Sequence, residues 1–226
     1  MLRIGIRVVL LVFAYNFLLT ACEKEGVAPS EFLDYETIAD LEIPFKQEWF
    51  VVWGGRTLGE NYHASLADQR FAFDVVQLEN NKTHVGDGGQ NEDYYCFGDT
   101  LYSPGAGRVV EMQTSVLDNI PGETNKDQLF GNYVIIDHGN QEYSVLAHFK
   151  LNSIFVKVGA VVTKGQVLGL TGNSGNSTEP HLHYHLQNHP GISQGAGLPA
   201  QFKDYYANDV FIPIGEPLRN QTIRKD

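Results

Sequence analysis

The sequence contains few residues of several kinds, and each shortage narrows the functions it can have. Only two of its 226 residues are cysteines. Lysine and arginine number 16 against 27 aspartates and glutamates, so the formal net charge is −11. This balance argues against nucleic acid as a partner and against a polybasic patch that binds membrane surfaces. No Gly-Lys-Ser or Gly-Lys-Thr ending of a phosphate-binding loop occurs, and nothing else indicates a nucleotide.

Long stretches with the apolar periodicity of an amphipathic helix are also lacking. From residue 48 onward, short runs rich in Val, Ile, Phe and Tyr alternate with Gly, Asn, Asp and Pro, a pattern typical of strands and turns. The sequence therefore predicts a mainly β domain. Its expected strands are 48–53, 70–77, 107–112, 133–138, 142–147, 167–171 and 181–187. The long polar segments 79–93 and 113–131 are expected to be walls of a functional site or disordered insertions.

The first 22 residues have the layout of a secretory signal. Two arginines precede an apolar run at 8–19, which is short for a transmembrane helix of about 20 residues. The sequence LTAC at 19–22 resembles the lipobox of bacterial lipoproteins. We expect residues 1–21 to be removed and Cys22 to carry lipid, which would anchor the protein to a membrane of the bacterial cell envelope. An ordinary cleaved signal and a membrane anchor helix are the alternatives, and the sequence leaves open whether the domain faces the periplasm or the exterior.

The remaining chain divides by composition into three parts. Residues 22–44 are acidic, lack a clear period and are expected to form a tether. Residues 45–190 are expected to form the main domain, and 191–226 a C-terminal extension that packs on it. With Cys22 lipidated, Cys96 has no disulfide partner, and its surroundings indicate an apolar filler rather than a nucleophile.

A row of histidines stands out in EPHLHYHLQ, residues 179–187. In a strand, His181, His183 and His185 point to one face, about 6.6 Å apart from one to the next, while the intervening Leu, Tyr and Leu point to the core. Upstream, His63, Asp74 and His148 are further candidates for a metal or catalytic site. An aspartate at 74 is unusual among the apolar residues of its expected strand unless it is paired or bound.

Several motifs together resemble the lysostaphin/LytM-like zinc metalloendopeptidases, which cut peptide bonds in peptidoglycan. They are FGDTLYSPGAGRVVE, GNYVIIDHG, LAHF and VKVGAVVTKGQVLGLTGNSGNSTEPHLHYHL, and the resemblance covers about residues 60 to 188. It implies a small antiparallel β domain with a groove over the central sheet, of the type called a duplicated hybrid motif. It also implies one zinc ion per chain and peptidoglycan peptides as the substrate.

The resemblance assigns roles to five residues. His183, the second histidine of H-x-H, corresponds to a zinc ligand, and we place the other two ligands at His63 and Asp74. Such a set leaves a position for the water that a hydrolytic zinc needs. His181 and His148 correspond to the pair that handles protons and developing charge. No H-E-x-x-H glutamate is present to act as the base, so we expect His181 to take the proton of the water and His148 to stabilise the oxyanion.

The chain departs from the family pattern in three places. Ten residues separate His63 from Asp74 where three are usual, so His84 is a reserve candidate for the ligand. Leu146 replaces the tyrosine of the familiar Tyr-Ala-His, and Glu179 replaces the usual small residue before Pro-His.

The remaining histidines have no ligand role in the resemblance. His185 is expected to hydrogen-bond next to a metal ligand, with plain packing as the alternative. The other three, His84, His138 and His189, lie in polar turns and are expected to be solvated.

The sequence thus predicts a zinc-dependent endopeptidase that acts on peptidoglycan. A catalytically inactive relative that binds or regulates cell-wall enzymes is the main alternative. A biotinyl- or lipoyl-like carrier module is a weaker one, because VGAVVTKGQVLG resembles its hairpin but the swinging lysine at a tight turn is missing.

The lipobox makes a testable prediction. Changing Cys22→Ser removes the thiol that lipid would modify, so incorporation of labelled fatty acid should stop and the protein should leave the membrane fraction. Labelling that persists unchanged in this variant would contradict the prediction.

Overall fold

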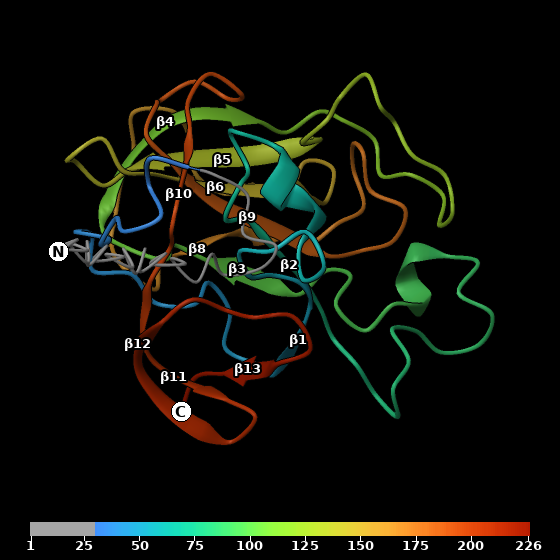
Figure 1. The fold of residues 1–226 in the computed structure, drawn as a ribbon. Helices are drawn as coiled ribbons and strands as arrows, with labels where there is room; N and C mark the ends of the chain where they lie inside the picture. Colours follow the sequence, from blue (N-terminus) through green and yellow to red (C-terminus); the bar gives the residue numbers. More distant parts are fainter. Residues whose placement is uncertain (1–29) are drawn as a thin grey trace, which may run out of the picture.

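Strands make up most of the regular structure in residues 30–226, the part of the chain that this computed structural model describes (Figure 1). The expected signal segment and Cys22 lie outside these residues. Within them, no helix is both long and apolar enough to cross a membrane. Two short 3-10 helices are present, η1 (Tyr62–Ser65) and η2 (Asn91–Asp93). The strands are β1 (Trp49–Trp53), β2 (Phe73–Val76), β3 (Thr100–Tyr102), β4 (Gly107–Gln113), β5 (Asn132–Asp137), β6 (Tyr143–Phe149), β7 (Val161–Val162), β8 (Val167–Leu170), β9 (Leu182–Gln187), β10 (Gly197–Leu198), β11 (Phe202–Ala207), β12 (Val210–Gly215) and β13 (Thr222–Arg224).

One 11-stranded sheet contains all of these strands except β3 and β8, which pair with each other. Its order is β12-β11-β13-β1-β2-β9-β6-β5-β4-β7, and β10 pairs with the end of β9 outside this order. Every pairing of these strands is antiparallel. The prediction of a mainly β, antiparallel fold is therefore confirmed. All seven expected strands form, with ends that differ by at most three residues.

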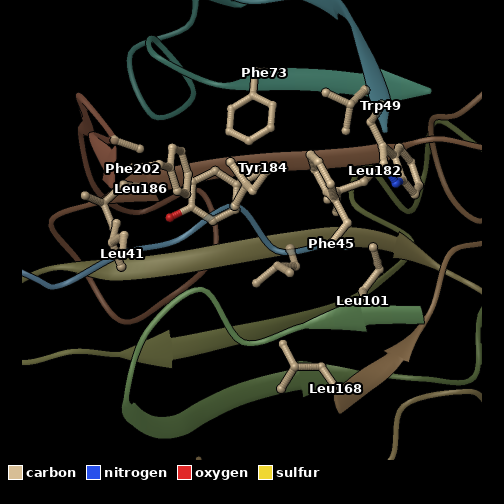
Figure 2. Close-up of a cluster of buried hydrophobic side chains, with 14 of the residues drawn as sticks. Leu41, Phe45, Trp49, Phe73, Leu101, Leu168, Leu182, Tyr184, Leu186 and Phe202 are labelled. Carbon is tan, nitrogen blue, oxygen red and sulfur yellow. The ribbon is translucent and has the colours of Figure 1, made fainter. Parts of the chain in front are cut away.

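The hydrophobic core contains the apolar face of β9 and packs between the main sheet and the β3–β8 pair (Figure 2). Leu182, Tyr184 and Leu186 are fully buried there. The ring of Tyr184 lies 5.2 Å from the rings of both Phe73 and Phe202. Because strand side chains alternate, the histidines at 183 and 185 point to the opposite face of the sheet, as the sequence predicts.

The C-terminal residues belong to the same sheet as the rest of the domain. Strands β11 and β13 lie between β12 and β1, and Phe202, Tyr205 and Ile223 are buried in the core. The sequence predicts an extension that packs on the domain from residue 191 onward. This segment contributes four strands to the main sheet, β10 to β13, of which β10 and β13 are too short to show a periodicity in sequence.

The segment expected to be a tether differs from that expectation between residues 35 and 44. Leu41 and Ile43 are buried in the core, and Leu41 forms a parallel bridge to β11. The fully buried carboxylate of Glu142 accepts hydrogen bonds from the backbone N–H groups of Ile38 and Ala39, both at 2.6 Å. It also accepts one from the Tyr35 hydroxyl at 2.8 Å. Two apolar side chains and one carboxylate thus hold this acidic segment on the domain.

This attachment makes a second prediction. Glu142→Gln replaces one carboxylate oxygen by an NH₂ group that cannot accept a hydrogen bond, and it removes the charge from the oxygen that still accepts. Hydrogen bonds to charged groups contribute about 1.5–3 kcal/mol, so the free energy of unfolding in urea should fall by roughly 2–3 kcal/mol.

Glu36→Gln is the matched control, because the same change occurs at an exposed side chain of the same segment. It should alter the free energy of unfolding by less than about 0.5 kcal/mol. Equal effects of the two substitutions would show that Glu142 does not hold the segment.

Candidate functional site

Three buried side chains from three elements converge on the face of the sheet opposite the core. His63 comes from η1, Asp74 from β2 and His183 from β9, and their exposed fractions are 2%, 6% and 3%. Asp74 Oδ2 lies 2.9 Å from His63 Nε2, and Asp74 Oδ1 lies 2.8 Å from His183 Nδ1. One ligand atom from each of the three residues can be chosen so that all lie within 4.8 Å of one another.

The ten residues between His63 and Asp74 form a closed excursion that returns to the sheet. Asn61, which is fully buried, caps η1 by accepting the N–H of His63 at 3.2 Å. Its Nδ2 group donates to the carbonyl of Gly55, which precedes η1, and to that of Ala72, near the end of this ten-residue segment. His63 is therefore held beside Asp74 in spite of the long spacing. His84 lies outside the cluster, with its ring 5.1 Å from that of Tyr94.

The pKa values of Asp74 and His183 depend on burial and on their neighbours in the cluster. Burial by itself would raise the pKa of Asp74, but His63 and His183 lower it well below its ordinary value. Burial lowers the pKa of His183, and Asp74 opposes that effect. The carboxylate is thus ionised and the environment of His183 favours a neutral imidazole.

These residues fit a divalent metal ion. Two imidazole nitrogens and one carboxylate form the donor set of many hydrolytic metal sites. The three side chains are buried, and the Nδ1 atom of His63 has no hydrogen-bond partner among the described residues. A buried cation would compensate the negative charge that the two histidines now surround.

A second pair of histidines, His148 and His181, lies beside the cluster with ring centroids 4.6 Å apart. His148 Nδ1 lies 2.7 Å from the carbonyl oxygen of Ser174, and His181 Nδ1 lies 2.9 Å from that of Glu179. Since a carbonyl only accepts, Nδ1 carries the proton in both rings and Nε2 of the neutral ring is free to accept one. Burial, reinforced by His181 and His183, lowers the pKa of His148 well below its ordinary value.

His148 also adopts a strained backbone conformation. Its φ is +65°, in the left-handed region that residues other than glycine rarely occupy. Gly131, next to the strand that pairs with β6, has a φ of +56°, and a Cβ atom there would collide with the carbonyl of Ser174. The chain thus needs a glycine at 131 so that the acceptor of the His148 proton can approach. Strain of this kind concentrates at functional sites.

The two long polar segments are not disordered insertions, because they are hydrogen-bonded to each other and to the loop before β9. Asn119 donates from Nδ2 to the carbonyls of Gly175 and Ser177, and its own carbonyl accepts from Asn91. Ser177 donates to Asn173 Oδ1 at 2.7 Å, and its hydroxyl lies 3.1 Å from His181 Nδ1. The sequence motifs give these residues no role, although Asn173 and Ser177 belong to the GNSGNST part of the motif that carries the resemblance.

A cavity of about 370 Å³ adjoins the histidines. Trp53, Tyr62, Asp74, Glu179 and His181 are among the residues that line it. Burial and the nearby Asp74 carboxylate raise the pKa of the Tyr62 phenol, which is therefore protonated at neutral pH. This phenol borders the metal-type cluster in a chain where Leu146 has replaced the familiar tyrosine. Glu179 lies on the rim, where it accepts a hydrogen bond from Thr83.

The other residues singled out in the sequence, His185, Cys96 and His138, are buried or half-buried. His185 is fully buried and its Nδ1 lies 3.0 Å from His183 Nε2. Cys96 is buried, donates to the carbonyl of Pro180 and has a pKa that burial raises to about 12, as expected of an inert thiol. The expectation of a solvated His138 is wrong: it is half-buried between Ala106 O and Ser144 Oγ, at 2.8 and 2.7 Å.

Comparison with known proteins finds similarity to a peptidase family and to proteins named endopeptidases. Residues 92–194 match the profile of the family described as Peptidase family M23. The peptidoglycan DD-endopeptidase ShyA of Vibrio cholerae is 45% identical over 69 residues, which are 30% of this chain and 16% of that protein. ShyB, also a peptidoglycan DD-endopeptidase of that organism, is 34% identical over 104 residues, 45% of this chain and 21% of that protein. The chain thus spans about a fifth or less of these relatives' length.

Among solved structures, the catalytic domain of the antimicrobial peptidase lysostaphin from Staphylococcus simulans has 21% identity and a TM-score of 0.37. The similarity covers 67% of this chain and 88% of that one. A mutant catalytic domain of the M23 protein EnpA from Enterococcus faecalis has 20% identity and a TM-score of 0.43 over 70% of this chain and 93% of that one.

The family match contains His148, His181 and His183 but neither His63 nor Asp74. The fold joins the two parts, because β2 pairs with β9 and η1 packs over them. Residues 92–194 therefore carry the similarity to peptidase family M23, and the fold places His63 and Asp74 next to them.

Proposed function

We propose that this protein is a zinc-dependent endopeptidase that hydrolyses peptide bonds in peptidoglycan, in cross-links or stem peptides. The observation that carries the proposal is the buried His63–Asp74–His183 cluster with the His148–His181 pair beside it. The family match and the relatives named peptidoglycan DD-endopeptidases support the reaction and the substrate class.

His63, Asp74 and His183 would hold the zinc ion, through the nitrogen and oxygen atoms that already converge. When bound, zinc lowers the pKa of a coordinated water towards about 7 and polarises a carbonyl oxygen. The carboxylate of Asp74 supplies the negative charge that makes this buried position favourable for a dication.

The two other histidines would handle protons. His181 lines the cavity and has an unprotonated Nε2 atom. It can therefore take a proton from the attacking water and return it to the departing amine. His148 has the same arrangement, so it donates to an oxyanion only when its Nε2 is protonated. In the overall reaction, hydroxide adds to the carbonyl carbon, the C–N bond breaks and the amine gains the proton.

The cavity suits an extended peptide. Its lining combines the aromatic faces of Trp53 and Tyr62 with the polar loop 176–179. The aromatic residues can cover the aliphatic parts of a short peptide while loop groups bind its amides. The substrate is in the cell wall, so the proposal places the protein in the bacterial cell envelope, where a lipid on Cys22 would hold it to a membrane.

The metal site makes a third prediction. Purified wild-type protein should contain one zinc per chain, and His63→Ala should lose most of it because one of three protein ligands is gone. His84→Ala is the matched control and should keep full zinc occupancy. Metal analysis that finds the reverse pattern would move the ligand from His63 to His84.

The proton-handling pair makes a fourth prediction. His181→Ala and His148→Ala should keep their zinc, since neither is in the ligand cluster, and should digest peptidoglycan sacculi about 10²-fold or more slowly. The assay should be run beside the metal analysis of the same samples. Wild-type protein that holds zinc but releases no fragments would favour the inactive, regulatory alternative, and a variant with zinc and near-normal turnover would remove that histidine from the mechanism.

A further inference from the structure

We propose that Gln187 and His185 are positioning residues that fix the ring proton of His183 on Nε2, so that Nδ1 presents its lone pair next to Asp74. The inference rests on the metal site proposed above and concerns what prepares that site. It involves three alternate residues of β9, all pointing away from the core. His185 and Gln187 are fully buried, so water does not compete for their polar atoms.

The direction of the hydrogen bonds is set at Gln187. Its Nε2 group lies 2.6 Å from the carbonyl oxygen of His189 and 3.1 Å from that of Gly191. Backbone carbonyls only accept, so this end of the amide is the NH₂ group and the other end is the oxygen. Gln187 Oε1 lies 3.1 Å from His185 Nε2, which must therefore carry a proton and donate it.

The proton position in His185 in turn determines the proton position in His183. A neutral imidazole has a proton on one nitrogen only, so His185 Nδ1 is an acceptor. It lies 3.0 Å from His183 Nε2, which must then be the donor. His183 Nδ1 is left with a lone pair, 2.8 Å from the carboxylate oxygen Oδ1 of Asp74.

Two acceptors at that separation repel each other unless a cation lies between or beside them. The chain of hydrogen bonds thus prepares His183 for a metal ion and disfavours the tautomer that would simply donate to Asp74. Partners of this kind orient metal-binding histidines and typically change metal affinity about 10–100-fold. The edge of this row is closed by the ring of Phe130, 5.8 Å from that of His183 and 5.6 Å from that of His185.

The test measures zinc affinity of the full chain by competition with a chromogenic chelator. His185→Phe keeps a ring but removes the acceptor, and should weaken zinc binding about 10–100-fold. His185→Gln supplies an amide oxygen that can accept from His183 and should restore most of the affinity. Gln187→Met, which leaves His185 in place but removes the acceptor that orients it, should weaken binding as well.

Tyr184→Phe is the matched control. It removes a buried hydrogen bond from the opposite face of the same strand, where the Tyr184 hydroxyl lies 2.8 Å from Ser144 Oγ. It should lower the stability of the protein and leave zinc affinity unchanged.

A direct readout needs no variant. Nitrogen NMR of the ¹⁵N-labelled, zinc-loaded wild-type protein should place the His183 proton on Nε2. A proton on Nδ1, or an unchanged zinc affinity in folded His185→Phe, overturns the inference and leaves the proposed function standing. Wild-type protein that binds no zinc overturns both.

Discussion

The register between β2 and β9 is the constraint on which the site depends. Antiparallel pairing sets Asp74 directly opposite His183, and on the next residue pair it sets Phe73 opposite Tyr184. The same pairing therefore fixes the metal-type cluster on one face and an aromatic contact on the other. A shift by one residue would send the carboxylate into the apolar core and Phe73 to the polar face. Packing of the core thus protects the geometry of the site.

Burial of the site has an energetic cost. A carboxylate with an exposed fraction of 6% is costly unless its charge is compensated. A dication held by Asp74 and the two histidines would compensate that charge. Outside this cluster, neighbouring loops hold His148 and His181 by single carbonyl acceptors. The site therefore has a rigid floor made of strands and a wall made of cross-linked loops.

Hydrogen bonds between loops explain why the long polar segments are ordered. Asn119 and Asn173 donate to backbone carbonyls of the opposing loop, and Asp118 accepts the N–H groups of Leu151 and Asn173. Side-chain amides and carboxylates replace the ladder of a sheet there. Such polar sequences look alike whether they are pinned or disordered, because their partners are remote in sequence.

Sequence alone determined the strands of the main domain and the two faces of β9, because alternation of residue type follows directly from the geometry of a strand. It also singled out His148, His181 and His183, whose local motifs are distinctive. It could not show that His63, rather than His84, joins Asp74. That outcome depends on Asn61, which bridges an excursion whose ends meet only in the folded chain. Nor could it show Gln187 behind His185, since the direction of a hydrogen bond is decided by atoms that only tertiary structure brings together.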